Sequence, residues 1–186
     1  MSAKEPTGET PMVQRTTDTQ DSALAASWRG HLRAVDRALG QSDVDGARRA
    51  WENAHLAAVE SHSWEGLILT GHACLRIGRA SGARQAAEPT ARRAYFAALY
   101  RACRESSFEG ILRAAEAFAD LGDREVVEEC LGLAELQVDG EETRRRLSTL
   151  VQRLGVAPTP ARSDGTASAS GVAWTGLAVA HGNGTP

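Results

Sequence analysis

The residues of this chain that could bind a metal or act as nucleophiles are five histidines and three cysteines. A metal site needs several such side chains on one side of the fold. His72 and Cys74 are two residues apart, which on a helix turns them about 200° away from each other. His55 and His62 are seven residues apart and share a helix face, but no carboxylate-rich segment accompanies them. We therefore expect neither a metal site nor a cofactor.

The cysteines do not show the pattern of a disulfide framework. They are an odd number at wide spacing without a CxxC pair, and they lie at Cys74, Cys103 and Cys130. Such cysteines are typical of reduced, mostly buried thiols in the cytosol. The first twenty residues lack the apolar stretch of a secretory signal, and no segment has the roughly 18 apolar residues of a membrane span. We expect a cytoplasmic protein without a membrane partner.

The sequence contains no recognised catalytic motif. A Gly-rich phosphate loop, a nucleophile elbow and an HExxH pair are all missing, and nothing marks two carboxylates as an acid–base pair. We therefore expect that the protein is not an enzyme. One alternative stays open, namely a small helical enzyme subunit or a sensor domain with a buried ligand.

Composition indicates that helices position these side chains. The 186 residues are 42% hydrophobic and 24% charged, which fits one water-soluble domain with tails. Ala, Leu, Arg and Glu are abundant and β-branched residues are scarce, which favours an all-α fold. The excess of Arg and Ala is typical of a GC-rich bacterial genome. A net charge of −3 offers no global attraction to nucleic acid, so nucleic acid is not an expected partner.

The chain divides into three segments by composition. Residues 1–20 are rich in Thr, Glu, Gln and Pro and predict a disordered segment, and residues 156–186 predict a flexible Ala/Gly/Ser/Thr/Pro-rich tail. Residues 21–155 predict one helical domain. Within the tail, residues 171–180 form either a docking motif or an incidental apolar stretch. Its large apolar residues are Trp174, Leu177 and Val179.

A pattern of serine, aromatic residue, charge and glycine occurs three times in the helical domain. The aromatic residues are Trp28, Trp64 and Phe108. Counted from them, small residues recur at position twenty, and position fifteen is Ser42, Gly78 and Gly122. The spacing predicts helical hairpins, each with a first helix of about fourteen residues, a tight turn at position fifteen and a second helix.

Signals for helix boundaries accompany the pattern. Capping boxes are predicted to begin at Ser42, Ser106 and Asp139. Pro89 lies inside the second helix of the second hairpin and predicts a kink or a split there. A final helix over 141–154 is expected to cap one end of the stack, and residues 21–24 to open the other end.

These residues resemble the tetratricopeptide repeat (TPR). The clearest match is in the third unit, at Ile111, Ala114, Ala115, Phe118, Gly122, Leu131 and Ala134. The units begin 36 and 44 residues apart instead of 34, and the proline that usually ends the motif is missing. The resemblance implies a short right-handed solenoid of about three helical hairpins plus a C-terminal capping helix.

In the TPR family, the first helix of each hairpin lines a concave groove. The resemblance carries this role to equivalent positions of the three units. They are Leu32, Asp36, Leu39, Ile68, His72, Leu75, Arg76, Leu112, Glu116, Ala119 and Asp120. We expect a non-enzymatic adaptor, chaperone or assembly factor that binds a peptide or helix of a protein partner in this groove. A homodimer through the final helix is a further expectation.

Charge is distributed unevenly along the domain. Residues 76–104 carry seven Arg against one Glu, and residues 105–142 carry twelve acidic residues against two Arg. Two interpretations stay open. Neighbouring helices pair their charges where they pack, or a bipolar surface orients a partner or drives head-to-tail self-association. Three aromatic residues of the basic segment are expected in the core, namely Tyr95, Phe96 and Tyr100.

Overall fold

The computed structural model describes residues 27–156, which form helices joined by short connections, with no strand among them. The predicted all-α class is confirmed for this range. The described residues end one residue beyond the predicted domain boundary. Outside them lie the predicted N-terminal segment 1–20, residues 21–26 of the predicted domain, and the tail with Trp174, Leu177 and Val179.

Helix follows helix with short connections throughout the described range. The helices are residues 27–40, α2 (Val44–Glu60), α3 (Trp64–Ala80), α4 (Arg84–Arg104), α5 (Phe108–Asp120), α6 (Arg124–Glu135) and α7 (Glu141–Leu154). Two of the predicted helix starts, Trp64 and Phe108, are the first residues of α3 and α5. The predicted final helix over 141–154 is α7.

The first five connections are turns of three residues with one backbone conformation. The middle residue of each turn has a positive φ, between 50° and 77°. These residues are Ser42, His62, Gly82, Ser106 and Gly122. A positive φ ends a helix because it turns the chain away from the helical path, and glycine adopts it without a Cβ penalty. The tight turn predicted at Gly122 is confirmed.

A side chain caps the helix that follows three of these turns. Each cap accepts a hydrogen bond from the backbone N–H three residues later, and the caps are Asp43, Ser63 and Ser107. The caps predicted at Ser42 and Ser106 are wrong by one residue, because those serines occupy the positive-φ position before the cap. The cap of α7 is Gly140 instead of Asp139, and the Gly140 N–H donates to the Thr143 hydroxyl.

The second hairpin differs most from the predicted repeat. Its turn lies at Gly82, four residues after the predicted turn at Gly78, because α3 has 17 residues and α5 only 13. Gly78 lies inside α3 and faces α4, where a Cβ built on it would be 2.6 Å from the Cβ of Ala87. Gly78 therefore does not form a turn. Its role is to let α3 and α4 approach closely.

Pro89 does not split α4, which runs without interruption over 21 residues. The proline is the sixth residue of the helix and is exposed. It removes one backbone hydrogen bond near the helix start. α4 packs against both α3 and α5, which stabilises it as one helix.

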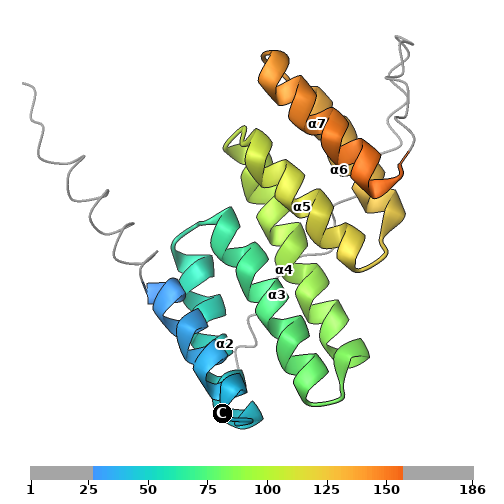
Figure 1. The fold of residues 1–186 in the computed structure, drawn as a ribbon. Helices are drawn as coiled ribbons and strands as arrows, with labels where there is room; N and C mark the ends of the chain where they lie inside the picture. Colours follow the sequence, from blue (N-terminus) through green and yellow to red (C-terminus); the bar gives the residue numbers. More distant parts are fainter. Residues whose placement is uncertain (1–26, 157–186) are drawn as a thin grey trace, which may run out of the picture.

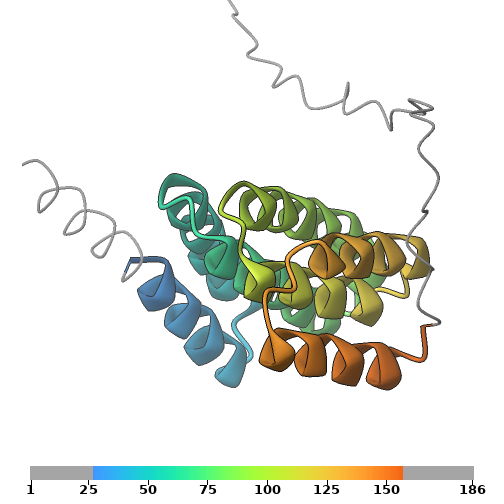
Figure 2. The ribbon, with the colours of Figure 1, turned by 90° about the horizontal axis from the view of Figure 1, so that it is seen from above.

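The helices lie in two rows (Figures 1 and 2). Row A consists of helix 27–40, α3, α5 and α7, and row B of α2, α4 and α6. α3 packs against α2, α4 and α5, and α5 packs against α3, α4, α6 and α7. Row-A helices therefore contact both rows. Among the described residues, no row-B helix follows α7.

One main apolar core holds the rows together. Its largest fully buried side chains include Trp28, Tyr95, Phe118, Leu67 and Ile111. The repeated serine–aromatic–charge–glycine pattern has a packing role here. The ring of Trp28 covers Gly66, and the ring of Trp64 covers Gly110, at 3.1 and 3.0 Å from a Cβ built on each glycine. The aromatic residue of one unit thus packs on the glycine of the next unit.

Candidate interaction surface

The predicted binding residues lie on three neighbouring row-A helices. Leu32, Asp36 and Leu39 are on helix 27–40, Ile68, His72, Leu75 and Arg76 are on α3, and Leu112, Glu116, Ala119 and Asp120 are on α5. Asp36 and Arg76 form an ion pair at 2.8 Å, which joins the first two sets. Asp120 and Glu116 lie close enough to His72 to act on its pKa, which places the third set beside the second.

Further ion pairs join successive row-A helices. They are Arg29–Glu65 at 2.9 Å between helix 27–40 and α3, and Glu109–Arg146 and Glu116–Arg153 between α5 and α7. All are partly exposed to solvent, so each contributes less than about 1 kcal/mol. They favour one alignment of helix 27–40 with α3 and of α5 with α7. Through Arg146 and Arg153, α7 becomes part of the surface, which the sequence did not predict.

The apolar members of the predicted groove are largely covered. Ile68, Leu75 and Leu112 are only 5–7% exposed, and Leu32, Leu39 and Ala119 are half-buried. Ile68, Leu75 and Leu112 belong to the main apolar core, and Leu32 and Ala119 pack against that core. The row-A surface is therefore mainly polar, with small apolar parts between its charged side chains.

His72 occupies the middle of row A with a fixed hydrogen-bond partner. Its Nδ1 lies 3.0 Å from the hydroxyl oxygen of Tyr95, which is buried in α4. Burial lowers the pKa of His72, although Asp120 acts in the opposite direction. Burial also raises the pKa of the Tyr95 hydroxyl. The hydrogen bond holds the His72 ring against Tyr95, and which of the two groups donates depends on the tautomer of the imidazole.

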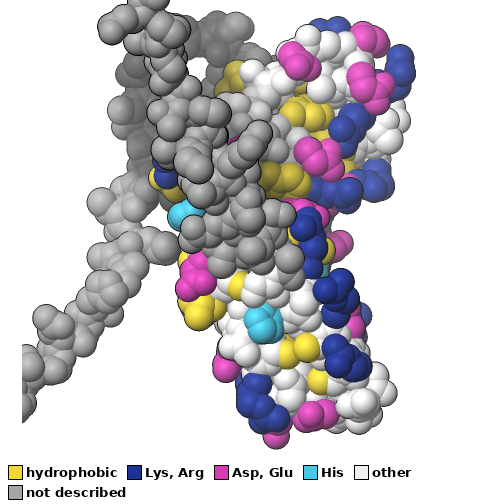
Figure 3. Space-filling model, turned by 90° about the vertical axis from the view of Figure 1, so that its left-hand side faces the viewer, with side chains coloured by type: hydrophobic (Ala, Val, Ile, Leu, Met, Phe, Trp, Pro, Cys, Tyr) yellow, Lys and Arg dark blue, Asp and Glu magenta, His cyan; other side chains and the backbone are white. Residues whose placement is uncertain are grey.

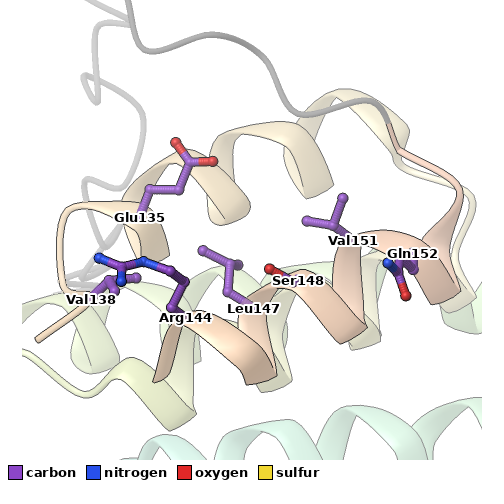
Figure 4. Close-up of a pocket in the computed structure, with 7 residues that line it drawn as sticks. All are labelled: Glu135, Val138, Arg144, Leu147, Ser148, Val151 and Gln152. Carbon is purple, nitrogen blue, oxygen red and sulfur yellow. The ribbon is translucent and has the colours of Figure 1, made fainter. Parts of the chain in front are cut away.

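Two solvent-open depressions adjoin α7. One, of about 470 Å³ between α5 and α7, contains the Glu109–Arg146 and Glu116–Arg153 pairs. The other, of about 630 Å³, runs along α7 beside the end of α6 (Figure 4). Its lining is Glu135, Val138, Arg144, Leu147, Ser148, Val151 and Gln152. Apolar and polar groups alternate along it.

Comparisons of the chain with protein-family models, with curated proteins and with solved structures find no match. In the described part of the chain, no helix is long and apolar enough to cross a membrane. Over residues 27–156, no three or more His, Cys, Asp or Glu side chains are grouped so that they could hold a metal ion. The function of the candidate surface is therefore inferred from its geometry alone.

A polar cluster between α2 and α3 was not predicted from the sequence. Thr70 is fully buried, and its hydroxyl donates to the Leu67 carbonyl at 2.9 Å. The Trp51 indole donates to the Thr70 carbonyl at 2.8 Å, and the Trp51 ring stacks on His55, with 5.4 Å between centroids. These groups satisfy one another, so the cluster is structural. Its residues are far apart in the sequence, which gives no signal of their proximity.

The surface charges only partly pair between helices. Arg92 binds Asp123 through two hydrogen bonds of 2.6 and 2.8 Å, which joins α4 to the start of α6. Figure 3 shows a face on which acidic and basic side chains are interspersed and hydrophobic side chains form small patches. Tyr95 is buried and Phe96 half-buried, as predicted, but Tyr100 is 55% exposed. Tyr100 points away from α3 and α5 because it is on the opposite side of α4 from Tyr95.

Proposed function

We propose that this protein is a non-enzymatic protein-interaction module whose row A binds a segment of a protein partner. The observation that carries the proposal is the lateral arrangement of four row-A helices, in which ion pairs join helix 27–40 to α3 and α5 to α7, and α3 packs against α5. A peptide or helix that crosses such a row meets side chains from each helix in turn. This arrangement suits an adaptor, chaperone or assembly factor.

We infer further that the module is a short TPR-like solenoid. Support comes from the recurrence of one turn conformation between consecutive helices and of one aromatic–glycine contact between consecutive units. The place of α7 beside α5 in row A supports a capping role for it. The polar residues Ser148 and Gln152 of α7 line the depression beside α6, and polar side chains are expected on the outer face of a capping helix.

The row-A surface favours a partner recognised by hydrogen bonds and ion pairs. Most charged side chains there already pair with each other, so a strongly charged partner gains little. His72 and Asp120 are the polar groups at the centre that form no ion pair within the described residues. The solvent-open cavities favour a macromolecular partner over the alternative of a small ligand enclosed in a sensor or enzyme subunit.

The proposal is tested by quantitative affinity capture from cells of the source organism. The test variant is His72→Glu with Asp120→Arg, in the centre of row A. The matched control is His62→Glu with Asp45→Arg, in the α2 region, where both side chains are exposed. We expect the test variant to lose a specific partner by about tenfold or more, because the substitutions remove central contacts. Equal recovery with wild-type and test protein would contradict the proposal.

A further inference from the structure

The outer side of row B carries a basic strip that spans α4 and the end of α2. On α4, Arg93, Tyr100 and Arg104 follow one another at helical spacing. Beside them on α2 are Leu56 and Val59, which are 58% and 39% exposed. We call these five residues the basic strip.

Arg101 fixes the two parts of the basic strip next to each other. Its guanidinium donates to the carbonyls of Ala58 at 3.2 Å and Val59 at 2.8 Å, so α4 caps the C-terminus of α2. Arg101 and Arg93 also both act on His55 of α2, whose pKa is lowered by burial and by these two charges. The exposed apolar groups of α2 therefore lie alongside the cations of α4.

The cations of the basic strip lack acidic partners within residues 27–156. Arg93 donates only to the Thr90 hydroxyl, at 3.1 Å, and Arg104 lies over the Tyr100 ring, 5.9 Å from its centroid. Glu105 is near enough to raise the pKa of Arg101, although burial lowers it, and over residues 27–156 the two side chains form no ion pair. Exposed apolar side chains flanked by unpaired cations are typical of a surface that binds an acidic, amphipathic segment.

An acidic strip with matching dimensions lies on α6 and its end. Glu125, Glu129, Leu133 and Leu136 recur at intervals of four, four and three residues, which places them on one helix face. Leu133 is 37% and Leu136 83% exposed. Within the described residues neither glutamate forms an ion pair, whereas the adjacent Glu128 pairs with Arg124 at 3.2 Å. We call these four residues the acidic strip.

We propose that the acidic strip of one copy of this chain docks on the basic strip of a second copy. The α4 part of the basic strip and the acidic strip each span twelve residues, 93–104 and 125–136, or about 16 Å along a helix. Arg93 then meets the glutamates, and the two leucines meet Tyr100 and the apolar side chains of α2. Burial of these apolar groups drives the contact, and the charges orient it.

The contact is heterologous, because two different surfaces meet. In a pair of copies, one copy therefore keeps a free basic strip and the other a free acidic strip. Such contacts extend into chains or close into rings. The area buried when one helix packs on two others is small compared with the roughly 800 Å² per partner of a stable interface. We therefore expect self-association that depends on concentration and weakens with salt.

The test is sedimentation velocity of the full chain from about 10 to about 500 µM, at about 50 and about 500 mM salt. Wild-type protein should associate at low salt. Arg93→Glu with Arg104→Glu should weaken association by about tenfold or more, and so should Glu125→Arg with Glu129→Arg. An equimolar mixture of the two variants should restore association, because Arg93→Glu then faces Glu125→Arg and Glu129→Arg. Arg33→Glu with Arg37→Glu, exposed on helix 27–40, is the matched control and should associate like wild type.

Three outcomes would overturn the proposal. They are a wild-type chain that stays monomeric over the whole range, strip variants that associate like wild type, and a mixture that does not restore association. If a charge-reversal variant loses helical circular dichroism, Leu136→Ser replaces it, because Leu136 is too exposed to support the fold. The capture experiment on row A and the sedimentation experiment change different residues and measure different quantities. Either proposal can therefore fail without the other.

Discussion

Tyr95 of α4 lies directly against the backbone of Gly71 in α3. A Cβ built on Gly71 would stand 2.2 Å from Cε1 of the Tyr95 ring. The same ring packs edge-on against Phe118 of α5, with 5.8 Å between centroids, and its hydroxyl reaches His72. One fully buried ring thus joins three helices beneath the centre of row A.

Gly71→Ala should lower the free energy of unfolding by about 1–3 kcal/mol, because the added methyl group displaces the Tyr95 ring. Denaturant unfolding followed by circular dichroism measures the change. Gly132→Ala is the matched control, since Gly132 is also inside a helix but has nothing within 4 Å of its built Cβ. The control should be neutral or stabilising by up to about 1 kcal/mol. A Gly71→Ala protein as stable as wild type would show that the helices are less closely packed.

The turn residues predict stability changes of opposite sign. Gly122 has φ 77°, so Gly122→Val should destabilise the fold by at least about 1 kcal/mol. Ser106 has φ 50° in an equivalent turn, so Ser106→Gly should leave stability unchanged or raise it by up to about 1 kcal/mol. Thermal melting of both variants checks this. An unchanged melting temperature for Gly122→Val would mean that the third hairpin does not require this backbone conformation.

Acidification through the range of histidine titration should destabilise the protein. Burial lowers the pKa of His55, with Arg101 and Arg93 acting in the same direction, and burial lowers the pKa of His72 despite Asp120. In the unfolded chain these histidines bind protons near pH 6.5, so below that pH the unfolded state binds more protons than the folded state. Stability is therefore full above about pH 6.5 and falls as the pH drops toward the folded pKa values.

The measurement for this prediction is the melting temperature between about pH 7.5 and about pH 5.5. The variant His55→Gln with His72→Gln should show a shallower fall than wild type over this range. His62→Gln is the control, because His62 is exposed in a turn. A melting temperature that rises on acidification would contradict the assignment.

A chain that ends at Val156 should keep the melting temperature of the full chain. Val156 is 8% exposed and belongs to the main core, so the shortened chain keeps all core residues that the structure describes. Val156→Asp in the full chain should lower the melting temperature, because it buries a carboxylate in that core. We expect removal of residues 157–186 to alter partner binding or self-association only. Failure of the shortened chain to fold would show that the tail contributes to the core.

The local features of the fold could be predicted from the sequence because their signals are local. The helix starts at Trp64 and Phe108 and the turn at Gly122 follow from residue types a few positions apart. The repeat pattern predicts a turn at Gly78 wrongly, because equal position numbers in the three units imply first helices of equal length. Two adjacent serines, as at Ser106 and Ser107, are equally able to cap a helix, so only the backbone conformation distinguishes them.

The candidate surface was less predictable because it depends on contacts between distant residues. Glu116 and Arg153 are 37 residues apart in the sequence, and nothing local indicates that they pair. The periodicity of α5 predicts that Leu112 and Glu116 lie on one helix face. It does not indicate how far the rest of the fold covers Leu112, which is 6% exposed. Exposure along row A depends on which side chains join the core that is shared with other helices, and the sequence pattern does not encode this.

Site-specific photo-crosslinking in cells of the source organism tests the binding role of row A most directly. A photoreactive phenylalanine derivative replaces His72 or Asp120 in row A, and Arg48 or Gln85 in row B as exposed controls. We predict a covalent adduct with the same protein from both row-A positions and none of that adduct from the two controls. An adduct that forms equally from all four positions, or only from row B, would contradict the account.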